Sequence, residues 1–347
     1  MARVLLLFGG RSSEHEVSCS SAVSVFDALE GGAHRVIPVG IDRAGEWFLA
    51  DSTTRPFRAE GRPVTFALPD GQLRIGGELL EFDVAFPVMH GPHGEDGTVQ
   101  GLLETANVPY VGCGVLGSAL AMDKDLAKTV VAARGMATAA WHTVHREQWD
   151  ADPAAVVDAS VASLSFPMFV KPSAQGSSIG VGRVADETGL KDAIAQAFRY
   201  DDKVIVENGI DGREIEVAVL DGPQMSLPGE VRVAGGWYTY DAKYADESSA
   251  FDAPADLADD LAAEVRILAG RVFTALGLNG LARIDFFYDR STGSFVFNEA
   301  NTMPGFTSIS GFPKMWAASG LAYPELCSHL VSAAIEQHAS RNRLATR

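Results

Sequence analysis

The richest concentration of residues that could do chemistry lies at 282–301, a stretch with the pattern of a β-hairpin. Side chains along a strand alternate between its two faces, so Arg283 and Asp285 share a face, and so do Glu299 and Asn301 on the returning strand. The position of the turn predicts that Asp285 lies opposite Glu299. Two carboxylates and an amide oxygen on one face form an all-oxygen site that suits Mg²⁺, which takes its remaining ligands from water and substrate phosphates.

The other face of the hairpin helps to decide between a metal site and an exposed polar face with a salt bridge. Ile284, Phe286 and Val296 make that face apolar, which predicts that it is buried. Like charges that face each other on the polar side then need a partner. Arg283 beside them could hold a developing negative charge, and Phe287 lies on the same face. We therefore favour the metal site.

A second group of residues has the composition of a phosphate-binding loop. Lys171 is predicted to end a strand, and the small residues that follow, up to Ser178, let backbone N–H groups approach phosphate oxygens closely. An ordinary hairpin turn is the alternative interpretation. Lys124 and Lys128 are four residues apart in a predicted helix, so they share a face that points either to solvent or to a phosphate.

Three further segments contain polar residues whose role the local pattern leaves open. Glu207 and Glu214 flank the turn between two predicted strands and could bind an adenine amine and ribose hydroxyls, or lie on the surface. Residues 90–97 form a loop dense in Gly, Pro and His after a buried strand, where functional residues are common. Residues 238–244 are aromatic and charged without periodicity, which predicts either a lid or a solvated connector.

The elements that must position these groups begin with a parallel α/β sheet in the first 115 residues. The expected strands are 4–8, 34–41 and 84–89, and the expected helices are 14–30 and 98–106. Ser12 and Ser13 can cap the first helix. Gly9 and Gly10 lie where the first strand meets this helix, at the edge where open α/β sheets bind ligands.

The rest of the chain divides into two further units, so the sequence predicts domains at 1–115, 116–206 and 207–347. The elements expected in them are helices at 117–134 and 187–200, strands at 167–171, 180–184, 214–220 and 230–233, a helix at 257–276, the hairpin, and a last helix at 324–338. Residues 151–165 could form another helix beside a linker.

Composition excludes several classes of protein. The 347 residues are 47% hydrophobic and 21% charged, as in globular chains and unlike disordered ones. The net charge of −17, from 28 Lys and Arg against 45 Asp and Glu, argues against nucleic acid as the main ligand. Three cysteines without a CxxC pair exclude a disulfide scaffold and a cysteine zinc site, and they predict a reducing cytoplasm. No apolar run is long enough to predict a membrane span.

Together these motifs resemble those of the D-alanine–D-alanine ligases of the ATP-grasp superfamily. The matching segments occur in the family's order and span nearly the whole chain: GGRSSEHEVS at 9–18, HGPHGEDGT at 90–98, MDK at 122–124, KPSAQGSS at 171–178, YDAKY at 240–244, RID at 283–285 and NEANTMPGFTSIS at 298–310. The resemblance implies an N-terminal parallel α/β (preATP-grasp) domain followed by a two-lobed ATP-grasp fold, with ATP between the lobes.

The resemblance also implies a reaction. The carboxylate of one D-alanine attacks the γ-phosphate of ATP to give an acyl phosphate, because a carboxylate is a poor electrophile until it carries a leaving group. The amine of a second D-alanine then attacks that carbonyl. The products are D-alanyl-D-alanine for peptidoglycan precursor synthesis, ADP and phosphate.

The resemblance further implies residues for the nucleotide and the metal. Two Mg²⁺ ions, or Mn²⁺, would be held by Asp285, Glu299 and Asn301. The nucleotide-binding residues would be Lys124, Lys171 and Lys243 at the phosphates, Ser178 in the phosphate loop, and Glu207, Glu214 and Phe287 at the nucleoside. Phosphoryl transfer depends mainly on such positioning and charge neutralisation.

The implied catalytic residues are Glu14, Ser177, Tyr244, Arg283 and Gly305, and the implied residues at the second substrate are His90 and Ser310. Arg283 and the Gly305 N–H would form an oxyanion hole, a role typically worth ~10²–10³ in rate per donor. Glu14 would take the ammonium group of the first D-alanine, in a hydrogen-bonded set with Ser177 and Tyr244.

Tyr244 bears on the second substrate, because relatives that use D-lactate are expected to have a histidine at that position. A neutral phenol does not repel an ammonium nucleophile, so we favour the dipeptide product. The alternatives are a D-alanine–D-lactate or D-alanine–D-serine ligase, and a non-catalytic ATP-binding protein that kept the fold. The family also implies a homodimer.

Overall fold

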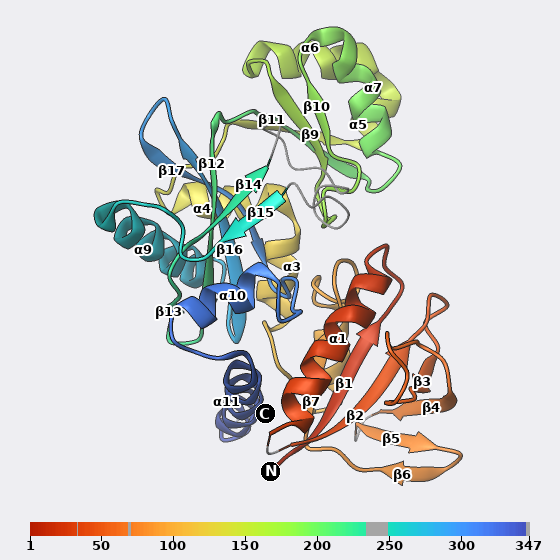
Figure 1. The fold of residues 1–347 in the computed structure, drawn as a ribbon. Coiled ribbons are helices and arrows are strands. Elements are labelled where there is room, and N and C mark those ends of the chain that lie inside the picture. The colour runs from red at the N-terminus through yellow and green to blue at the C-terminus, as the bar shows by residue number, and fades with distance from the viewer. Residues whose placement is uncertain (33, 69–70, 234–248, 345–347) are drawn as a thin grey trace.

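Three β-sheets organise the part of the chain that the computed structural model describes, which is residues 1–32, 34–68, 71–233 and 249–344. Figure 1 shows the N-terminal sheet at the lower right, a small sheet with its helices at the top, and the third sheet between them with the blue C-terminal helices. The sheets follow one another along the sequence, so each is built from a continuous stretch of chain.

The N-terminal sheet is mixed rather than wholly parallel. Its order is β6-β5-β4-β3-β2-β1-β7, and only β1 (Arg3–Gly9), β2 (Arg35–Ile41) and β7 (Val84–Val88) run parallel, as expected. The antiparallel extension comprises β3 (Trp47–Leu49), β4 (Arg62–Ala67), β5 (Gln72–Ile75) and β6 (Glu78–Leu80). The sequence analysis missed these strands because they are short and largely lack apolar runs.

Two helices accompany this sheet close to their predicted positions. They are α1 (His15–Glu30) and α2 (Thr98–Thr105). The predicted serine cap of α1 is wrong, because Glu14 occupies the N-cap position and makes no side-chain cap bond. Instead, the Ser12 hydroxyl accepts a hydrogen bond of 3.1 Å from the Glu14 backbone N–H.

The middle sheet is antiparallel, in the order β10-β9-β11-β8. Its strands are β8 (Trp141–His145), β9 (Met168–Pro172), β10 (Gly182–Val184) and β11 (Lys203–Asn208), and its helices are α5 (Arg146–Ala151), α6 (Pro153–Ser163) and α7 (Glu187–Ala197). The helix expected at 151–165 is α6. Strand β8 was not predicted, and β11 was implied only as the strand before the turn at 209–212, without bounds.

The third sheet has the order β15-β14-β12-β16-β17, with β13 paired to β12. Its strands are β12 (Gly212–Leu220), β13 (Gln224–Met225), β14 (Gly229–Val233), β15 (Ser249–Asp252), β16 (Leu281–Asp289) and β17 (Ser294–Asn301). The remaining helices of the described chain are α3 (Val115–Met122) and α4 (Lys124–Ala133), which precede the middle sheet in the sequence, and α9 (Asp259–Ala275), α10 (Gly311–Ala318) and α11 (Tyr323–Arg341). The helices α3 and α4 contact β17, and α9 contacts β12 and β16.

The single helix predicted at 117–134 is two helices that meet at Asp123. This residue has an extended backbone, with φ −83° and ψ 101°, and its carboxylate accepts a hydrogen bond from the Leu126 N–H. Aspartate favours such caps because its side chain replaces the missing backbone acceptor. The break makes Lys124 the first residue of a helix.

The β16–β17 hairpin confirms the predicted pairing of Asp285 with Glu299, but the register shifts beyond that pair. Phe286 pairs with Phe297 and Phe287 pairs with Val296, so Asn298 is an extra residue on β17. The assignment of Val296 to the face of Phe286 is therefore wrong, and Phe297 lies there instead. A bulge of this kind bends the strand next to a site.

The C-terminal segment returns to the N-terminal sheet. Phe306 is fully buried, and its ring centroid lies 5.9 Å from that of Phe86 on β7 and 5.6 Å from that of Phe312 on α10. One hydrophobic core contains residues of β1, β7, α1 and α11, and α11 contacts both α1 and β7. The N-terminal sheet and the C-terminal segment are thus packed together.

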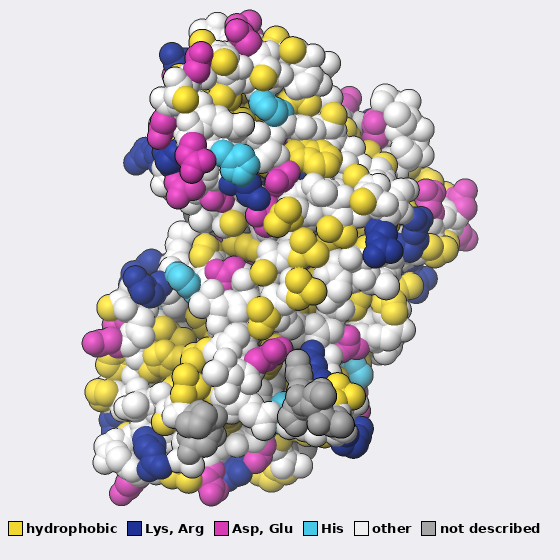
Figure 2. Space-filling model, turned by 180° about the vertical axis from the view of Figure 1, so that it is seen from behind, with side chains coloured by type: hydrophobic (Ala, Val, Ile, Leu, Met, Phe, Trp, Pro, Cys, Tyr) yellow, Lys and Arg dark blue, Asp and Glu magenta, His cyan; other side chains and the backbone are white. Residues whose placement is uncertain are grey.

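Two further features of the described residues bear on the sequence analysis. None of their helices is both long and apolar enough to cross a membrane. On the face shown in Figure 2, acidic and basic side chains are interspersed and hydrophobic ones gather across the middle. The division into domains at 115 and 206 stays a prediction.

Phe306→Ala is expected to lower the free energy of unfolding by about 3–5 kcal/mol, because truncating a fully buried ring leaves a cavity. The measurement is urea denaturation followed by circular dichroism. Ile267→Ala is the control, since that side chain is 60% exposed, and it should change stability by less than about 0.5 kcal/mol. Equal effects of the two substitutions would contradict the packing described.

Candidate functional site

A cavity of about 600 Å³ lies where the middle and third sheets approach each other. Its lining comes from β9, β11 and the loop after β9 on one side, and from β12, β14, β16 and β17 on the other. The predicted nucleotide or metal residues that line it are Lys124, Lys171, Ser178, Glu207, Glu214, Phe287 and Glu299. Lys243 and Tyr244 lie outside the described residues.

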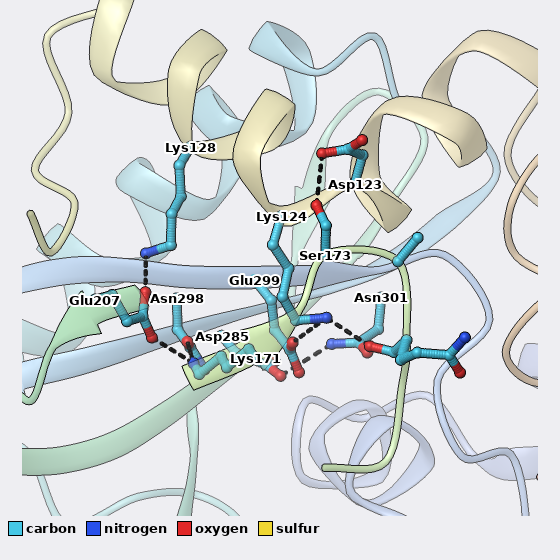
Figure 3. Close-up of polar contacts among 12 residues, drawn as sticks. Asp123, Lys124, Lys128, Lys171, Ser173, Glu207, Asp285, Asn298, Glu299 and Asn301 are labelled. Carbon is cyan, nitrogen blue, oxygen red and sulfur yellow. Dashed lines mark hydrogen bonds and ion pairs between the residues drawn. The ribbon is translucent and has the colours of Figure 1, made fainter. Parts of the chain in front are cut away.

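At the back of this cavity a carboxylate lies between two lysines (Figure 3). The Glu207 Oε1 atom is 2.5 Å from the Lys171 Nζ, and its Oε2 atom is 2.8 Å from the Lys128 Nζ. The Lys171 ammonium group also donates a hydrogen bond of 3.2 Å to the Asn298 Oδ1. Glu207 and Lys128 are buried, so the alternatives of a surface glutamate and a solvated lysine are wrong.

Lys124 joins helix α4 to the loop that follows β9. Its backbone N–H donates to the Ser173 carbonyl at 3.0 Å, and its Nζ donates to the Gln175 carbonyl at 2.6 Å. The same Nζ is 3.5 Å from the Glu299 Oε2. Asp123 strengthens this junction, because its carboxylate accepts a hydrogen bond of 2.9 Å from the Ser173 hydroxyl.

The loop after β9 connects two antiparallel strands, as the hairpin interpretation predicted, and it also lines the cavity. Ser177 and Ser178 have positive φ angles of 49° and 57°. Non-glycine residues adopt this conformation rarely, and they do so most often where the surrounding structure holds them. The positive φ angles of Ser177 and Ser178 therefore distinguish this loop from an ordinary hairpin turn.

Arg283 pairs with two carboxylates on the third sheet. Its Nε and Nη2 atoms donate to the two oxygens of Asp285 at 2.8 and 2.7 Å, and its Nε is 3.2 Å from the Glu216 Oε2. Burial lowers the pKa of Arg283, but the carboxylates of Asp285 and Glu216 outweigh it and hold that pKa well above its usual value. Arg283 and Asp285 are consequently buried and paired, whereas Glu299 and Asn301 on the same face of the hairpin are partly exposed.

The donors beside Arg283 fit a hard cation. Asp285 and Glu299 are cross-strand partners, and the Asn301 Nδ2 donates a hydrogen bond of 3.0 Å to the Asp285 Oδ2. Among the described residues no group of three His, Cys, Asp or Glu side chains could hold a metal by itself. Two carboxylates and an amide match instead an ion that takes part of its ligands from phosphate, provided that Asn301 presents its amide oxygen.

Glu14 and Ser177 meet although they are 163 positions apart in the sequence, and the Ser177 hydroxyl donates a hydrogen bond to the Glu14 Oε1. Two glycines make room for this contact. A Cβ atom on Gly91 would lie 2.5 Å from the Glu14 Oε2, and one on Gly176 would lie 2.8 Å from it. The sequence analysis predicted this pair, and the structure brings it together.

His90 connects the N-terminal sheet to the segment after β17. Its Nδ1 lies 2.8 Å from the Met303 carbonyl and its Nε2 lies 2.9 Å from the Ser21 hydroxyl. A carbonyl only accepts, so Nδ1 carries a proton and Nε2 accepts from Ser21. Burial lowers the pKa of His90, so the ring is neutral.

Glu95 makes a second connection to the same segment, and the sequence analysis assigned it no role. Its two oxygens accept hydrogen bonds of 2.9 Å from the Gly91 and Met303 backbone N–H groups. Burial and the charge of Glu14 raise the pKa of Glu95 to about 8. The sequence feature that could have identified Glu95 is its position in the loop at 90–97, where functional residues are common.

The segment after Met303 contains the last predicted residues. The Ser310 hydroxyl lies 2.8 Å from that of Thr307 and accepts a hydrogen bond of 3.1 Å from the Thr307 N–H. A Cβ atom on Gly305 would lie 3.2 Å from this hydroxyl oxygen, so the two residues are neighbours. Glu216 and Asn298 are the other side chains that the sequence analysis left without a role, although both stand in segments that it examined.

Comparisons with known proteins give a consistent result. Residues 3–113 match the family described as D-ala D-ala ligase N-terminus, and residues 130–332 match the one described as D-ala D-ala ligase C-terminus. A D-alanine–D-alanine ligase from Kineococcus radiotolerans is 46% identical over 365 residues, covering 96% of this chain and 97% of the relative.

Two solved structures are similar over nearly the whole chain. The D-alanine-D-alanine ligase from Coxiella burnetii has a TM-score of 0.87 at 34% identity, covering 99% of this chain and 96% of that one. The VanG D-Ala:D-Ser ligase from Enterococcus faecalis has a TM-score of 0.84 at 34% identity, covering 96% of this chain and 99% of that one.

Glu95→Gln is expected to flatten the dependence of stability on pH. With a pKa of about 8 in the folded chain, against 4.5 ordinarily, this carboxyl group keeps a proton that the unfolded chain loses. Stability is therefore lost as pH rises through that window. The midpoint of thermal unfolding of the unmodified chain should fall more than that of the variant between about pH 5 and 8.5. The exposed Glu147→Gln is the control, and equal slopes for all three proteins would contradict the assignment.

Proposed function

The chain belongs to the D-alanine–D-alanine ligase family, an ATP-dependent enzyme family, and we propose how its residues carry out the ligation. In this reaction an oxygen of the first D-alanine's carboxylate forms a bond to the γ-phosphorus while the bridging P–O bond breaks and ADP leaves. The amine of the second D-alanine then bonds to the acyl carbon, loses a proton, and inorganic phosphate leaves. The observation that carries the proposal is the buried Arg283–Asp285 pair beside a cavity lined by lysines.

The nucleotide occupies the cavity between the middle and third sheets. Lys124 and Lys171 bind the α- and β-phosphates, with backbone N–H groups of the loop at Ser178, and Lys243 binds the γ-phosphate. The adenine and ribose contact the remaining residues assigned to the nucleoside, Glu207, Glu214 and Phe287. Support for this assignment is that every described member of the set lines one cavity.

Asp285, Glu299 and Asn301 hold two Mg²⁺ ions, for which Mn²⁺ can substitute. Bound metal neutralises phosphate charge and so lowers the barrier to phosphoryl transfer. Support comes from the chemistry of the donors, two carboxylates and an amide that adjoin the phosphate-binding lysines.

Arg283 and the Gly305 backbone N–H form the oxyanion hole for the tetrahedral intermediate. A guanidinium group held by Asp285 and Glu216 cannot turn away when charge develops, which is the advantage of a preorganised donor. The Met303 backbone accepts from His90 and donates to Glu95, which holds the chain two residues before Gly305 in place.

Glu14 binds the ammonium group of the first D-alanine and is oriented by Ser177, with Tyr244 as the third member of the set. The second substrate binds near His90 and Ser310. The neutral His90 ring adds no charge there, so an uncharged amine can approach and attack. The homodimer and the cytoplasmic location also stay predictions.

D-Serine is the second candidate for the acceptor, because the chain is 34% identical both to a D-alanine-D-alanine ligase structure and to a D-Ala:D-Ser ligase structure. The overall fold does not discriminate between them. A mixture of D-alanine, D-serine and D-lactate with ATP, analysed by product mass, decides the question. We expect D-alanyl-D-alanine to dominate.

The purified protein is expected to release one phosphate per dipeptide formed from D-alanine, ATP and MgCl₂. Chelation of the metal with EDTA should abolish phosphate release, and added Mg²⁺ or Mn²⁺ should restore it. Phosphate is measured by a coupled colorimetric assay and the dipeptide by mass. Tight binding of ATP without any turnover would support the non-catalytic alternative instead.

Arg283→Lys is expected to lower kcat by about 10²–10³-fold, since a lysine cannot aim two donors at once. The affinity for ADP should change less than threefold, because Arg283 is assigned to the intermediate and not to the nucleotide. Arg271→Lys, on the exposed side of α9, is the control. A kcat within threefold of the unmodified value would refute the role of Arg283.

A further inference from the structure

Lys128 has no role in the reaction just described, although it is one of the most deeply buried charged residues of the described chain. Its exposed fraction is 1%, and its Nζ lies 2.8 Å from the Glu207 Oε2. The ring centroid of Trp141 lies 6.0 Å from the same Nζ and covers it from another side. Lys128 belongs to the lining of the cavity, but its side chain has almost no exposed surface to offer a ligand.

Glu207 uses its two oxygens for two different lysines. Oε2 faces Lys128, while Oε1 faces Lys171, and Lys171 also reaches Asn298 (Figure 3). In the proposed function Lys171 binds a phosphate, which competes with Glu207 for the same ammonium group. Lys128 has no such competitor, so it is the partner that Glu207 keeps when nucleotide is bound.

The charges around Glu207 keep it ionised. Burial alone would raise its pKa, but Lys128 of α4 and Lys171 of β9 outweigh burial and lower the pKa to about 2. Glu299 of β17 and Glu214 of β12 act on these lysines from further away. Burial lowers the pKa of Lys128 as well, and Glu207 opposes that shift. Each member of the buried pair therefore maintains the charge of the other.

We propose that Lys128 is a positioning residue for nucleotide base selection: by pairing with Glu207 in the cavity lining, it maintains a fixed carboxylate that accepts only from a base with an exocyclic amine. This inference rests on the proposed contact between Glu207 and adenine. An ionised carboxylate has no proton to donate, so it binds the 6-amino group of adenine and repels the 6-oxo group of hypoxanthine. A buried site that hydrogen-bonds one substituent rejects its replacement strongly.

The experiment compares ATP with ITP, which differs from ATP in carrying the 6-oxo group. In Lys128→Met the ratio of kcat/KM for ATP to that for ITP should fall at least tenfold, through KM for the nucleotide, while KM for D-alanine stays unchanged. Lys128→Arg keeps a cation and should restore most of the ratio. Lys191→Met, at an exposed position of α7, is the matched control and should leave it intact.

A pH series provides a readout that a purely structural role would not change. Without Lys128 the burial of Glu207 has less opposition, so the pKa of this carboxyl group should rise and the group should take up a proton at a higher pH than in the unmodified enzyme. The ATP-to-ITP ratio of Lys128→Met should then decline with falling pH, whereas that of the unmodified enzyme should not. A ratio and pH profile equal to the unmodified enzyme's would overturn the proposal.

Two further measurements keep the test decisive. If Lys128→Met does not fold, the double variant Lys128→Met/Glu207→Gln removes both buried charges and should fold, and its binding of ADP and IDP should be equal within threefold. A retained preference for ADP would overturn the proposal. Failure of the unmodified enzyme to prefer ATP would refute the base contact of Glu207, and failure to form dipeptide would refute the proposed function, so the three failures are distinct.

Discussion

A buried charge is stable only when an opposite charge or several hydrogen bonds surround it. The charged side chains in and beside the cavity between the middle and third sheets are all subject to this constraint. Arg283 satisfies it with Asp285 and Glu216, and Glu207 satisfies it with Lys128 and Lys171. Breaking such a pair by removing one partner typically costs about 3–5 kcal/mol. The charged groups are consequently held in one arrangement by their mutual pairing, before any substrate arrives.

The segment after β17 depends on contacts from two directions. His90 and Glu95 bond the backbone of Met303 from the N-terminal sheet, while Phe306 enters the hydrophobic core shared with β7. Gly305 lies between these two attachments. The backbone assigned to the oxyanion hole is therefore fixed relative to Glu14, which the N-terminal sheet also positions.

Similarity to solved structures identifies the family of the chain, but it does not identify the second substrate that accepts the acyl group. The chain aligns over nearly its whole length with a D-alanine-D-alanine ligase and with a D-Ala:D-Ser ligase, at the same identity. The overall fold is thus common to relatives whose names give different acceptors.

Local sequence patterns predicted contacts correctly where the period of a strand or helix determines which side chains share a face. The alternation of strand side chains predicted Asp285 opposite Glu299, the helical period placed Lys124 and Lys128 on one face, and family motifs identified the pair Glu14 and Ser177. The same rules missed the antiparallel strands of the N-terminal sheet, and they missed β8, which pairs with the distant strand β11.

Only the tertiary structure determined which polar side chains are buried and which side chains they pair with. The extra residue Asn298 changes which side chain of β17 faces Phe286, and no pattern within the strand signals it. The burial of Lys128 against Glu207 requires α4 and β11 to meet, although the two residues are 79 positions apart along the chain. Period and composition act over a few neighbours, whereas the energy of a buried charge depends on everything that surrounds it in space.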